Sequence, residues 1–338
     1  LKHYGALGSI KKLTLKSDEE YVEAFQEVFQ EAVNSRLRTY RSVGSQLSGG
    51  LDSGSVVGFA VKKLKEQNKS LHTYSYRPPK DFIDFTNKRL FADESPYAKS
   101  TADFVGGIKD HYIAFEDENS YSVINDMLDV MEMPYKFFEN SFWLKGIFEK
   151  ASEDNLGILL NGDLGNYSIS WGYALDYYEQ LLKRFKWFSL YRELKAYSKK
   201  MNVARSRLIK SIAKDSFPMI SKLTSREEKW HYPQVINSNF AESTGIFNKL
   251  KAFGIDQYGW FSVSNIYKLR TKMYQSIFPW NTGNTLGSKL SLRHALWKRD
   301  PTNDLRVVRF CLSLPSEQFV QNGMDRALIR RATQNILP

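Results

Sequence analysis

The stretch Val43-Gly-Ser-Gln-Leu-Ser-Gly-Gly-Leu-Asp-Ser-Gly-Ser-Val-Val57 decides how the rest of the chain is understood. The run that ends at Leu47 predicts a buried strand, and the small residues at 48–53 predict a tight turn. Apolar residues then recur at helical spacing, which predicts a helix. A strand, a glycine turn and a helix aim backbone N–H groups and the positive end of the helix at an anion. The stretch therefore predicts a phosphate-binding site.

The turn itself reads Ser-Gly-Gly-Leu-Asp-Ser at residues 48–53. No lysine follows its second glycine, so it is not the Gly-x4-Gly-Lys-Ser/Thr loop. It resembles the Ser-Gly-Gly-x-Asp-Ser signature of the PP-loop ATP pyrophosphatases, which cleave ATP to AMP and pyrophosphate. An ordinary glycine-rich turn is the alternative. We favour nucleotide binding because the whole pattern occurs between a predicted strand and a predicted helix.

The bulk composition indicates a cytoplasmic globular protein. The chain has 338 residues, 42% of them hydrophobic, which suffices for one large domain or two smaller ones. We find no run of about 18 apolar residues and no signal peptide, so we expect no membrane partner. The one cysteine, Cys311, excludes an internal disulfide and suits a reducing compartment.

The formal net charge of +11 favours an anionic partner such as ATP, RNA or an acidic peptide. Lys and Arg are spread along the chain, which indicates a solvated surface for most of them. We therefore do not expect nucleic acid as the partner.

Strand and helix patterns alternate along the first half of the chain. Strands are expected at residues 43–47, 71–76, 111–115 and 156–160, with helices between them. This predicts an α/β fold with a doubly wound parallel sheet, whose ligands bind beyond the carboxyl ends of the strands. Irregular helices and loops are expected over residues 214–290, and helices again at 304–314 and 325–334.

Three further segments resemble asparagine synthetases. Leu159-Leu-Asn-Gly-Asp-Leu-Gly-Asn-Tyr-Ser-Ile-Ser-Trp-Gly-Tyr173 resembles their second nucleotide motif. Arg299-Asp-Pro-Thr-Asn-Asp304 resembles their Arg-x-Pro-Phe-Leu-Asp segment, and Arg326-Ala-Leu-Ile-Arg-Arg-Ala332 resembles part of their C-terminal pattern. The resemblance implies a PP-loop (HUP-like, adenine nucleotide α-hydrolase-like) fold with an extensive helical C-terminal part.

On this resemblance we divide the chain into three segments. Residues 1–40 form a connecting segment and helix, and residues 41–172 form the ATP-binding core. Residues 173–338 form a helical, substrate-binding part of the same synthetase domain. The chain starts at Leu1 and no cysteine precedes Cys311, so we expect the N-terminal glutaminase-like domain to be absent from this chain.

The Gly-Asn-x-Ser-Ile-Ser form of the second motif, at residues 165–170, is more similar to lasso peptide cyclases, the macrolactam synthetases. This resemblance implies an ATP-dependent carbon–nitrogen ligase that uses Mg²⁺. A side-chain carboxylate is adenylated, and the precursor peptide's own N-terminal amine displaces AMP. It also implies a leader peptidase and a leader-binding protein as partners.

The resemblance further assigns roles to single residues. It implies that the backbone at Ser75 and Tyr76 reads adenine and that Gly162 faces the ribose or adenine. It implies an acid/base or metal role for Asp163, and for Glu193 a carboxylate that orients a base. The pyrophosphate-binding residues are then Ser48, Gly49, Gly50, Leu51, Asp52 and Ser53, and the Mg²⁺ ligands are Asp52, Asp163 and Asn166.

Two departures from the family pattern matter. Asn166 stands where asparagine synthetases carry a Mg²⁺-binding Asp, and a neutral amide oxygen is a weaker ligand for a hard cation. Either Asp163 compensates or one metal is poorly held. The family also places a catalytic Lys after its Leu-Pro, and the sequence stops at Pro338 before such a residue. We expect that segment to be missing, or this form to lack it.

Other functions stay open on the sequence alone. The first is asparagine synthetase (glutamine-hydrolysing) or another small-molecule amide ligase. A PP-loop tRNA-modifying enzyme would suit the charge but lacks the C-terminal pattern. A non-catalytic scaffold has only Asn166 in its favour. The substrate, ring size, acceptor residue and oligomeric state are not determined by the sequence.

Overall fold

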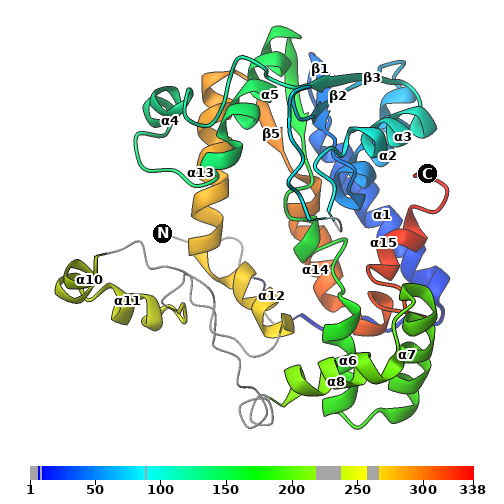
Figure 1. Cartoon of the computed structure of the whole chain (residues 1–338). Coiled ribbons are helices and arrows are strands. Elements are labelled where there is room, and N and C mark those ends of the chain that lie inside the picture. The colour runs from blue at the N-terminus through cyan, green and yellow to red at the C-terminus, as the bar shows by residue number, and fades with distance from the viewer. Residues whose placement is uncertain (1–6, 8–9, 88–89, 218–236, 257–265) are drawn as a thin grey trace. The chain divides into compact units, whose positions relative to one another are not determined.

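The computed structural model describes residues 7, 10–87, 90–217, 237–256 and 266–338 (Figure 1). The chain divides into two compact units, one comprising Leu1–Ala174 with Phe278–Pro338, the other Leu175–Ile277. The sequence division grouped all residues after 172 in one helical part, whereas the contacts place the last segment in the first unit. That segment therefore helps to build the unit that contains the sheet.

The first unit is built on a five-stranded sheet in the order β3-β2-β1-β4-β5, with all neighbours parallel. The strands are β1 (Ser42–Gln46), β2 (Leu71–Tyr76), β3 (Ile108–Ile113), β4 (Leu156–Leu160) and β5 (Trp297–Arg299). β2 and β3 lie on one side of β1, and β4 lies on the other. The topological switch point is thus between β1 and β4, where ligands bind in such sheets. This confirms the predicted doubly wound α/β fold, although β3 begins at Ile108 rather than His111.

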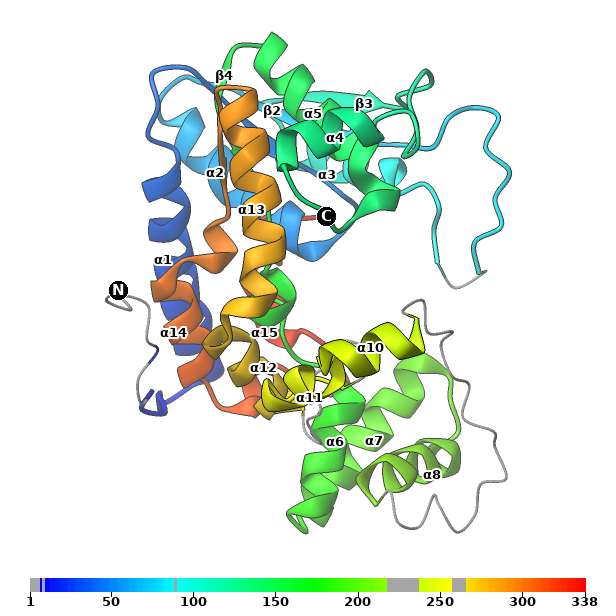
Figure 2. The ribbon, with the colours of Figure 1, turned by 90° about the vertical axis from the view of Figure 1, so that its left-hand side faces the viewer.

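Helices flank both faces of this sheet. They are α1 (Asp18–Arg36), α2 (Leu51–Lys65), α3 (Ser95–Val105), α4 (Ile124–Met131), α5 (Ser141–Glu153), α13 (Ile277–Arg293), α14 (Leu305–Ser313) and α15 (Ala327–Ala332). One core cluster joins Tyr74 and Leu159 of the sheet to Met127 of α4, Ile147 of α5 and Leu286 of α13 (Figure 2). α2 packs on β1 and β2, and α1 packs on α2, outside that cluster.

The start of α1 follows from its sequence. Ser17 Oγ accepts a hydrogen bond from Glu20 N at 3.2 Å, and Glu20 Oε2 accepts one from Lys16 N at 2.9 Å. These reciprocal bonds satisfy N–H groups that have no partner within the helix. Phe25 and Phe29 then lie one turn apart on its buried face, with Phe29 edge-on to Phe59 of α2 at 5.0 Å.

The second unit is helical. Its described helices are α6 (Ala174–Lys183), α7 (Trp187–Met201), α8 (Arg205–Ser216), α10 (Ser238–Thr244), α11 (Ile246–Ala252) and α12 (Ile266–Gln275). Tyr178 is fully buried and meets Tyr197 edge-on at 5.7 Å, so part of the aromatic stripes is core. Phe188 and Tyr191 are exposed instead. Residues 218–236 and 257–265 of the region expected to be irregular lie outside the described residues.

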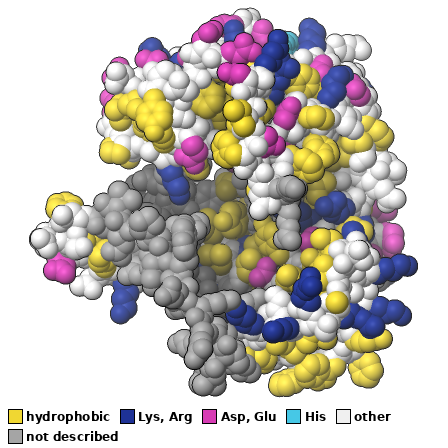
Figure 3. Space-filling view, viewed as in Figure 1, with side chains coloured by type: hydrophobic (Ala, Val, Ile, Leu, Met, Phe, Trp, Pro, Cys, Tyr) yellow, Lys and Arg dark blue, Asp and Glu magenta, His cyan; other side chains and the backbone are white. Residues whose placement is uncertain are grey.

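The surface agrees with the dispersed charge of the sequence. Lys and Arg side chains are scattered over the face shown in Figure 3 and alternate with Asp and Glu. The basic side chains in this view therefore form no single binding face.

Among the helices described, none combines the length and the hydropathy needed to cross a bilayer.

Candidate functional site

The loop between β1 and α2 is held in shape by two serines. Ser53 Oγ accepts a hydrogen bond from Ser48 N at 3.1 Å, and the two hydroxyl oxygens lie 2.9 Å apart. Ser48 Oγ also accepts one from Gly50 N at 3.2 Å. Leu51 is the first residue of α2, and Gly54 N donates to the Gly50 carbonyl at 3.1 Å. The loop thus places backbone N–H groups and a helix N-terminus at the end of β1, which is an anion-binding geometry.

One N–H group of this loop already binds a carboxylate. Glu94 Oε2 accepts a hydrogen bond from Gly49 N at 3.1 Å. A Cβ on Gly49 would stand 2.8 Å from the Cβ of Tyr97, so only glycine fits there. The neighbouring Asp93 instead accepts from Ser95 N at 2.8 Å, at the start of α3. Glu94 therefore contacts the loop, whereas Asp93 caps a helix.

The loop after β4 lies against the first turn of α2. Asn161, the first residue after β4, donates from its backbone N to the Arg299 carbonyl at 3.1 Å. A Cβ on Gly162 would stand 2.9 Å from the carbonyl carbon of Asp52, and one on Gly165 would overlap the Asp52 carboxylate. Both glycines are needed because the two loops approach so closely. The two sequence motifs therefore form one site at the switch point between β1 and β4.

Asp52 carries a buried carboxylate oxygen without a partner. Its Oδ1 is inaccessible to solvent and makes no hydrogen bond to the residues described. Ser170 lies beside the Asp52 side chain, and its Oγ donates to Asn166 Oδ1 at 3.4 Å. Burial raises the pKa of Asp52 above its usual value, while Ser170 and the charge of Arg326 oppose the rise. Burying an acceptor that receives no hydrogen bond lowers the stability of the folded protein, unless a ligand binds to that acceptor.

These atoms fit a Mg²⁺ ion. Mg²⁺ takes oxygen ligands, and Asp52 Oδ1 is an unpaired carboxylate oxygen. Asn166 supplies an amide oxygen that accepts from Ser170 Oγ, beside the same carboxylate. Asp52 and Asn166 would hold the ion, which would neutralise phosphate charge when bound.

Asp163 is paired with a cation from β5. Lys298 Nζ lies 2.5 Å from Asp163 Oδ2, and the Asp163 side chain is 53% exposed. The pair places one positive and one negative group at the adjoining carboxyl ends of β4 and β5. The acid/base or metal role of Asp163 stays a prediction.

Asp300 binds the second loop to the end of β5. Its Oδ1 accepts hydrogen bonds from Thr302 N at 2.8 Å and Thr302 Oγ1 at 2.6 Å, and its Oδ2 accepts one from Leu164 N at 3.1 Å. Burial raises the pKa of Asp300 to about 6; the bonds from Thr302 oppose this rise, and the charge of Asp163 adds to it.

The end of β2 is closed by packing. Ser75 Oγ donates to the Leu47 carbonyl at 2.7 Å, which ties β2 to the loop after β1. The Tyr76 ring stacks on Trp143 and meets Phe142 edge-on, both at 5.6 Å. The Ser75 hydroxyl is thus engaged, and the reading of adenine by the backbone at Ser75 and Tyr76 stays a prediction.

Glu193 lies on α7 in the second unit, where its residue is only 3% exposed. Its predicted role in orienting a base stays a prediction.

Comparison with known proteins decides the family. A family profile described as asparagine synthase matches residues 24–338. The chain belongs to the asparagine synthase family. It is 22% identical over 334 residues to asparagine synthetase (glutamine-hydrolyzing) 3 of Bacillus subtilis. That alignment covers 95% of this chain and 47% of the relative. It is 34% identical over 122 residues to amidase chry2 of Gibberella zeae, which covers 36% of this chain and 18% of that protein.

This asparagine synthase family chain thus spans less than half the length of these curated relatives. Among solved structures, the U34-tRNA thiolase NcsA from Methanococcus maripaludis aligns over 70% of this chain and 74% of its own. The TM-score is 0.32 and the sequence identity 15%, a likeness too weak to bear on function.

Several site residues escaped the sequence reasoning. Asp300 could have been found from the sequence, since Asp followed by Pro commonly starts a helical turn. In such a turn the Asp side chain accepts a hydrogen bond from the backbone N–H two residues later, here that of Thr302. Ser170 was inside the quoted motif without an assigned role. Arg326 was inside the quoted C-terminal pattern without an assigned role, and Lys298 carried no signal, because its place depends on the tertiary fold. The side-chain amide of Asn161 is buried with neither polar atom partnered among the described residues, at the switch point itself.

Proposed function

We propose that this chain forms amide bonds by activating a carboxylate with ATP, and that its substrate is a lasso-type precursor peptide closed into a macrolactam. The observation that carries the nucleotide site is the unpartnered Asp52 Oδ1 beneath Gly162 and Gly165, at the switch point of the sheet. Membership of the asparagine synthase family supports the amide chemistry.

The proposed reaction has two steps. A substrate carboxylate oxygen attacks the α-phosphorus of ATP, forming an acyl-adenylate and releasing pyrophosphate. The amine nitrogen then attacks the acyl carbon, AMP leaves with the bonding electrons, and the amine proton passes to a base. ATP is needed because a carboxylate and an amine do not condense in water at neutral pH. The enzyme holds both ends together and keeps water from the adenylate.

Residues of this chain would serve the first step through electrostatics. The N–H groups of the loop and the Ser48 and Ser53 hydroxyls would hold the leaving pyrophosphate at the start of α2. Asp52 and Asn166 would hold Mg²⁺.

The finer proposal, macrolactam closure, rests on the form of the second motif. Its Gly-Asn-Tyr-Ser-Ile-Ser segment places exposed Asn166 beside buried Ser170. A leader peptidase and a leader-binding protein are the proposed partners, because the N-terminal amine must first be freed from a leader.

Pyrophosphate release tests the proposal. Purified chain with ATP and Mg²⁺ should release pyrophosphate when given a leader-free precursor peptide, and mass spectrometry should show that peptide losing one water. Asp52→Asn should abolish both signals while circular dichroism stays unchanged. Full pyrophosphate release by Asp52→Asn would disprove the nucleotide site.

The second candidate is asparagine synthetase, which the Bacillus subtilis relative favours because its likeness spans 95% of this chain. Release of pyrophosphate with free aspartate and ammonia, and none with peptide, would select it. In either case Asp52 has the same role, so the substrate panel separates the two functions.

A further inference from the structure

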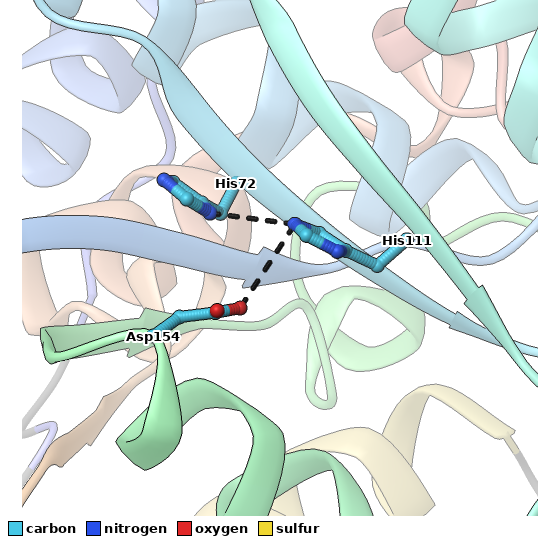
Figure 4. A group of neighbouring side chains, drawn as sticks. All are labelled: His72, His111 and Asp154. Carbon is cyan, nitrogen blue, oxygen red and sulfur yellow. Dashed lines mark hydrogen bonds and ion pairs between the residues drawn. The ribbon is translucent and has the colours of Figure 1, made fainter.

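A cluster of two histidines and one carboxylate lies apart from the nucleotide loops. His72 of β2, His111 of β3 and Asp154, which follows α5, point toward one another (Figure 4). One ligand atom from each residue lies within 4.8 Å of the other two. The amide-forming chemistry proposed above gives these residues no task.

The strand pairing explains why they meet. Tyr74 of β2 pairs with His111 of β3, and His72 stands two residues before Tyr74. Residues two apart share a face of a strand, so His72 and His111 are diagonal neighbours on one face. His72 is four residues before Tyr76 and therefore roughly 13 Å along the strand from the nucleotide end. Asp154 approaches this face from the end of α5, just before β4 starts.

We propose that His72, His111 and Asp154 bind a divalent transition-metal ion, with Zn²⁺ as the reference ion. His72 Nδ1 lies 3.4 Å from His111 Nε2, and Asp154 Oδ2 lies 4.0 Å from His111 Nε2. Zn²⁺ bonds of about 2.0 Å in a tetrahedral site separate neighbouring ligand atoms by about 3.3 Å. The two nitrogens already have this spacing. A small rotation of Asp154, whose side chain is 38% exposed, supplies the rest.

The type of ligand selects the type of ion. Two imidazoles and one carboxylate suit Zn²⁺, Co²⁺ or Ni²⁺ rather than Mg²⁺, which prefers oxygen. Three protein ligands leave a fourth position for water, and the 35% exposed His111 side chain gives an ion a path from solvent.

Tyr74 holds two of the three residues in place. Its hydroxyl donates to Asp154 Oδ2 at 2.5 Å, and its ring stacks on His111 at a centroid distance of 4.8 Å. Hydrogen bonds to metal-binding carboxylates commonly orient them. A bound ion would join β2 and β3 to the end of α5, so it should stabilise the first unit against unfolding.

The test uses the untagged full chain, freed of metal with a chelator and dialysed. Zn²⁺ is titrated against a chromophoric competitor in excess Mg²⁺, which occupies oxygen sites. His111→Phe keeps an aromatic ring stacked on Tyr74 but removes one imidazole ligand. His72→Gln removes the other imidazole ligand. We expect each of these variants to bind one equivalent of Zn²⁺ fewer than wild type. Tyr74→Phe should keep that equivalent but bind it with roughly 10-fold lower affinity. Zn²⁺ should raise the Tm of wild type but not of His111→Phe.

His294→Gln is the matched control, because His294 is a partly buried histidine outside the cluster. It should bind as much Zn²⁺ as wild type. Circular dichroism checks that each variant is folded. If His111→Phe is destabilised, Zn²⁺ binding by His72→Gln is compared with that of wild type instead. Equal Zn²⁺ stoichiometry and affinity in wild type and the folded cluster variants would overturn the proposal, as would no binding by wild type. Neither result touches the ATP site, whose test is pyrophosphate release.

Discussion

Gly165 lies directly against the carboxylate of Asp52, with no room for a side chain between them. The two residues belong to loops that follow different strands, β1 and β4. Their contact makes one site of two sequence motifs. The position of the Asp52 carboxylate is therefore set by a residue more than a hundred positions away.

Replacing Gly165 with Ala should displace the Asp52 carboxylate. The new methyl group would overlap Asp52 Oδ1 and Cγ, so the carboxylate or the second loop must shift. A displacement near 1 Å at a catalytic constellation costs about a hundredfold in rate. We expect ATP–pyrophosphate exchange to fall by about that factor.

Gly283→Ala is the control for this substitution. Gly283 lies in α13, and nothing stands within 4 Å of a Cβ placed there. Alanine should leave exchange unchanged and raise the free energy of unfolding by about 0.5 kcal/mol. Equal exchange rates in the Gly165→Ala and Gly283→Ala variants would contradict the close contact.

Glu94 occupies the Gly49 N–H that we expect phosphate to bind. Its carboxylate accepts that hydrogen bond at 3.1 Å, where an anionic phosphate oxygen is expected. Glu94→Gln removes the negative charge, and the KM for ATP should fall roughly two- to fivefold, as for a screened surface charge. Asp93→Asn removes the same charge from a residue that caps α3 instead, and should change the KM less. A higher KM in Glu94→Gln would instead assign Glu94 to binding the nucleotide.

Asp300 should make the protein less stable as pH rises from about 4 to about 6. Burial raises its pKa from 3.8 to about 6, so the folded protein keeps a proton that the unfolded chain releases. The unfolded state binds fewer protons in this window, and the free energy of unfolding falls by up to about 3 kcal/mol. Asp300→Asn should remove this decline, as urea denaturation at several pH values would show.

Asp84→Asn serves as the control for the pH series. Hydrogen bonds from Thr86 lower the pKa of exposed Asp84, so its contribution has the opposite sign and is lost as pH falls. The decline above pH 4 should persist in this variant. A decline that survives in Asp300→Asn would show that another carboxylate causes it.

An ion pair joins α1 to the start of α14. Arg36 Nη1 lies 2.5 Å from Asp304 Oδ2, and Asp304 Oδ1 accepts from Arg306 N at 2.8 Å. Burial alone would raise the pKa of Asp304, but the bonds from Arg306 and Arg36 hold it far below its usual range. Arg36→Met removes one of the two cations paired with Asp304 while Arg306 remains, so the free energy of unfolding should fall by about 2 kcal/mol. Exposed Arg38→Met should change it by less than about 0.5 kcal/mol in the same urea titration.

The sequence predicted those structural elements whose conformation depends on residues close together along the chain. The strand, loop and helix around Ser48 and Gly50 follow from apolar spacing and small residues within one stretch. The capping bond of Ser17 is likewise local. The asparagine synthase motifs assigned Gly162 and Asp52 separate roles at one nucleotide site, and the structure places the two residues in contact.

Tertiary pairing decided the rest. α13 was expected to be irregular, because residues 214–290 are polar and show weak helical periodicity, although Leu286 and Leu290 are buried. β5 is only three residues long and is a strand only through pairing with β4. The Lys298–Asp163 pair depends on that strand, so no local pattern could indicate it.

The distance along the chain between Leu164 and Asp300 has a consequence for synthesis. These residues are 136 positions apart, yet Asp300 holds the loop that covers Asp52. A nascent chain that has left the ribosome with β1 to β4 complete still lacks the edge strand and the anchor of its second loop. Such an intermediate exposes an unpaired strand edge on β4, a state prone to aggregation and suited to chaperones. We therefore expect the proposed nucleotide site to be completed late in translation, after residues 175–277 have emerged.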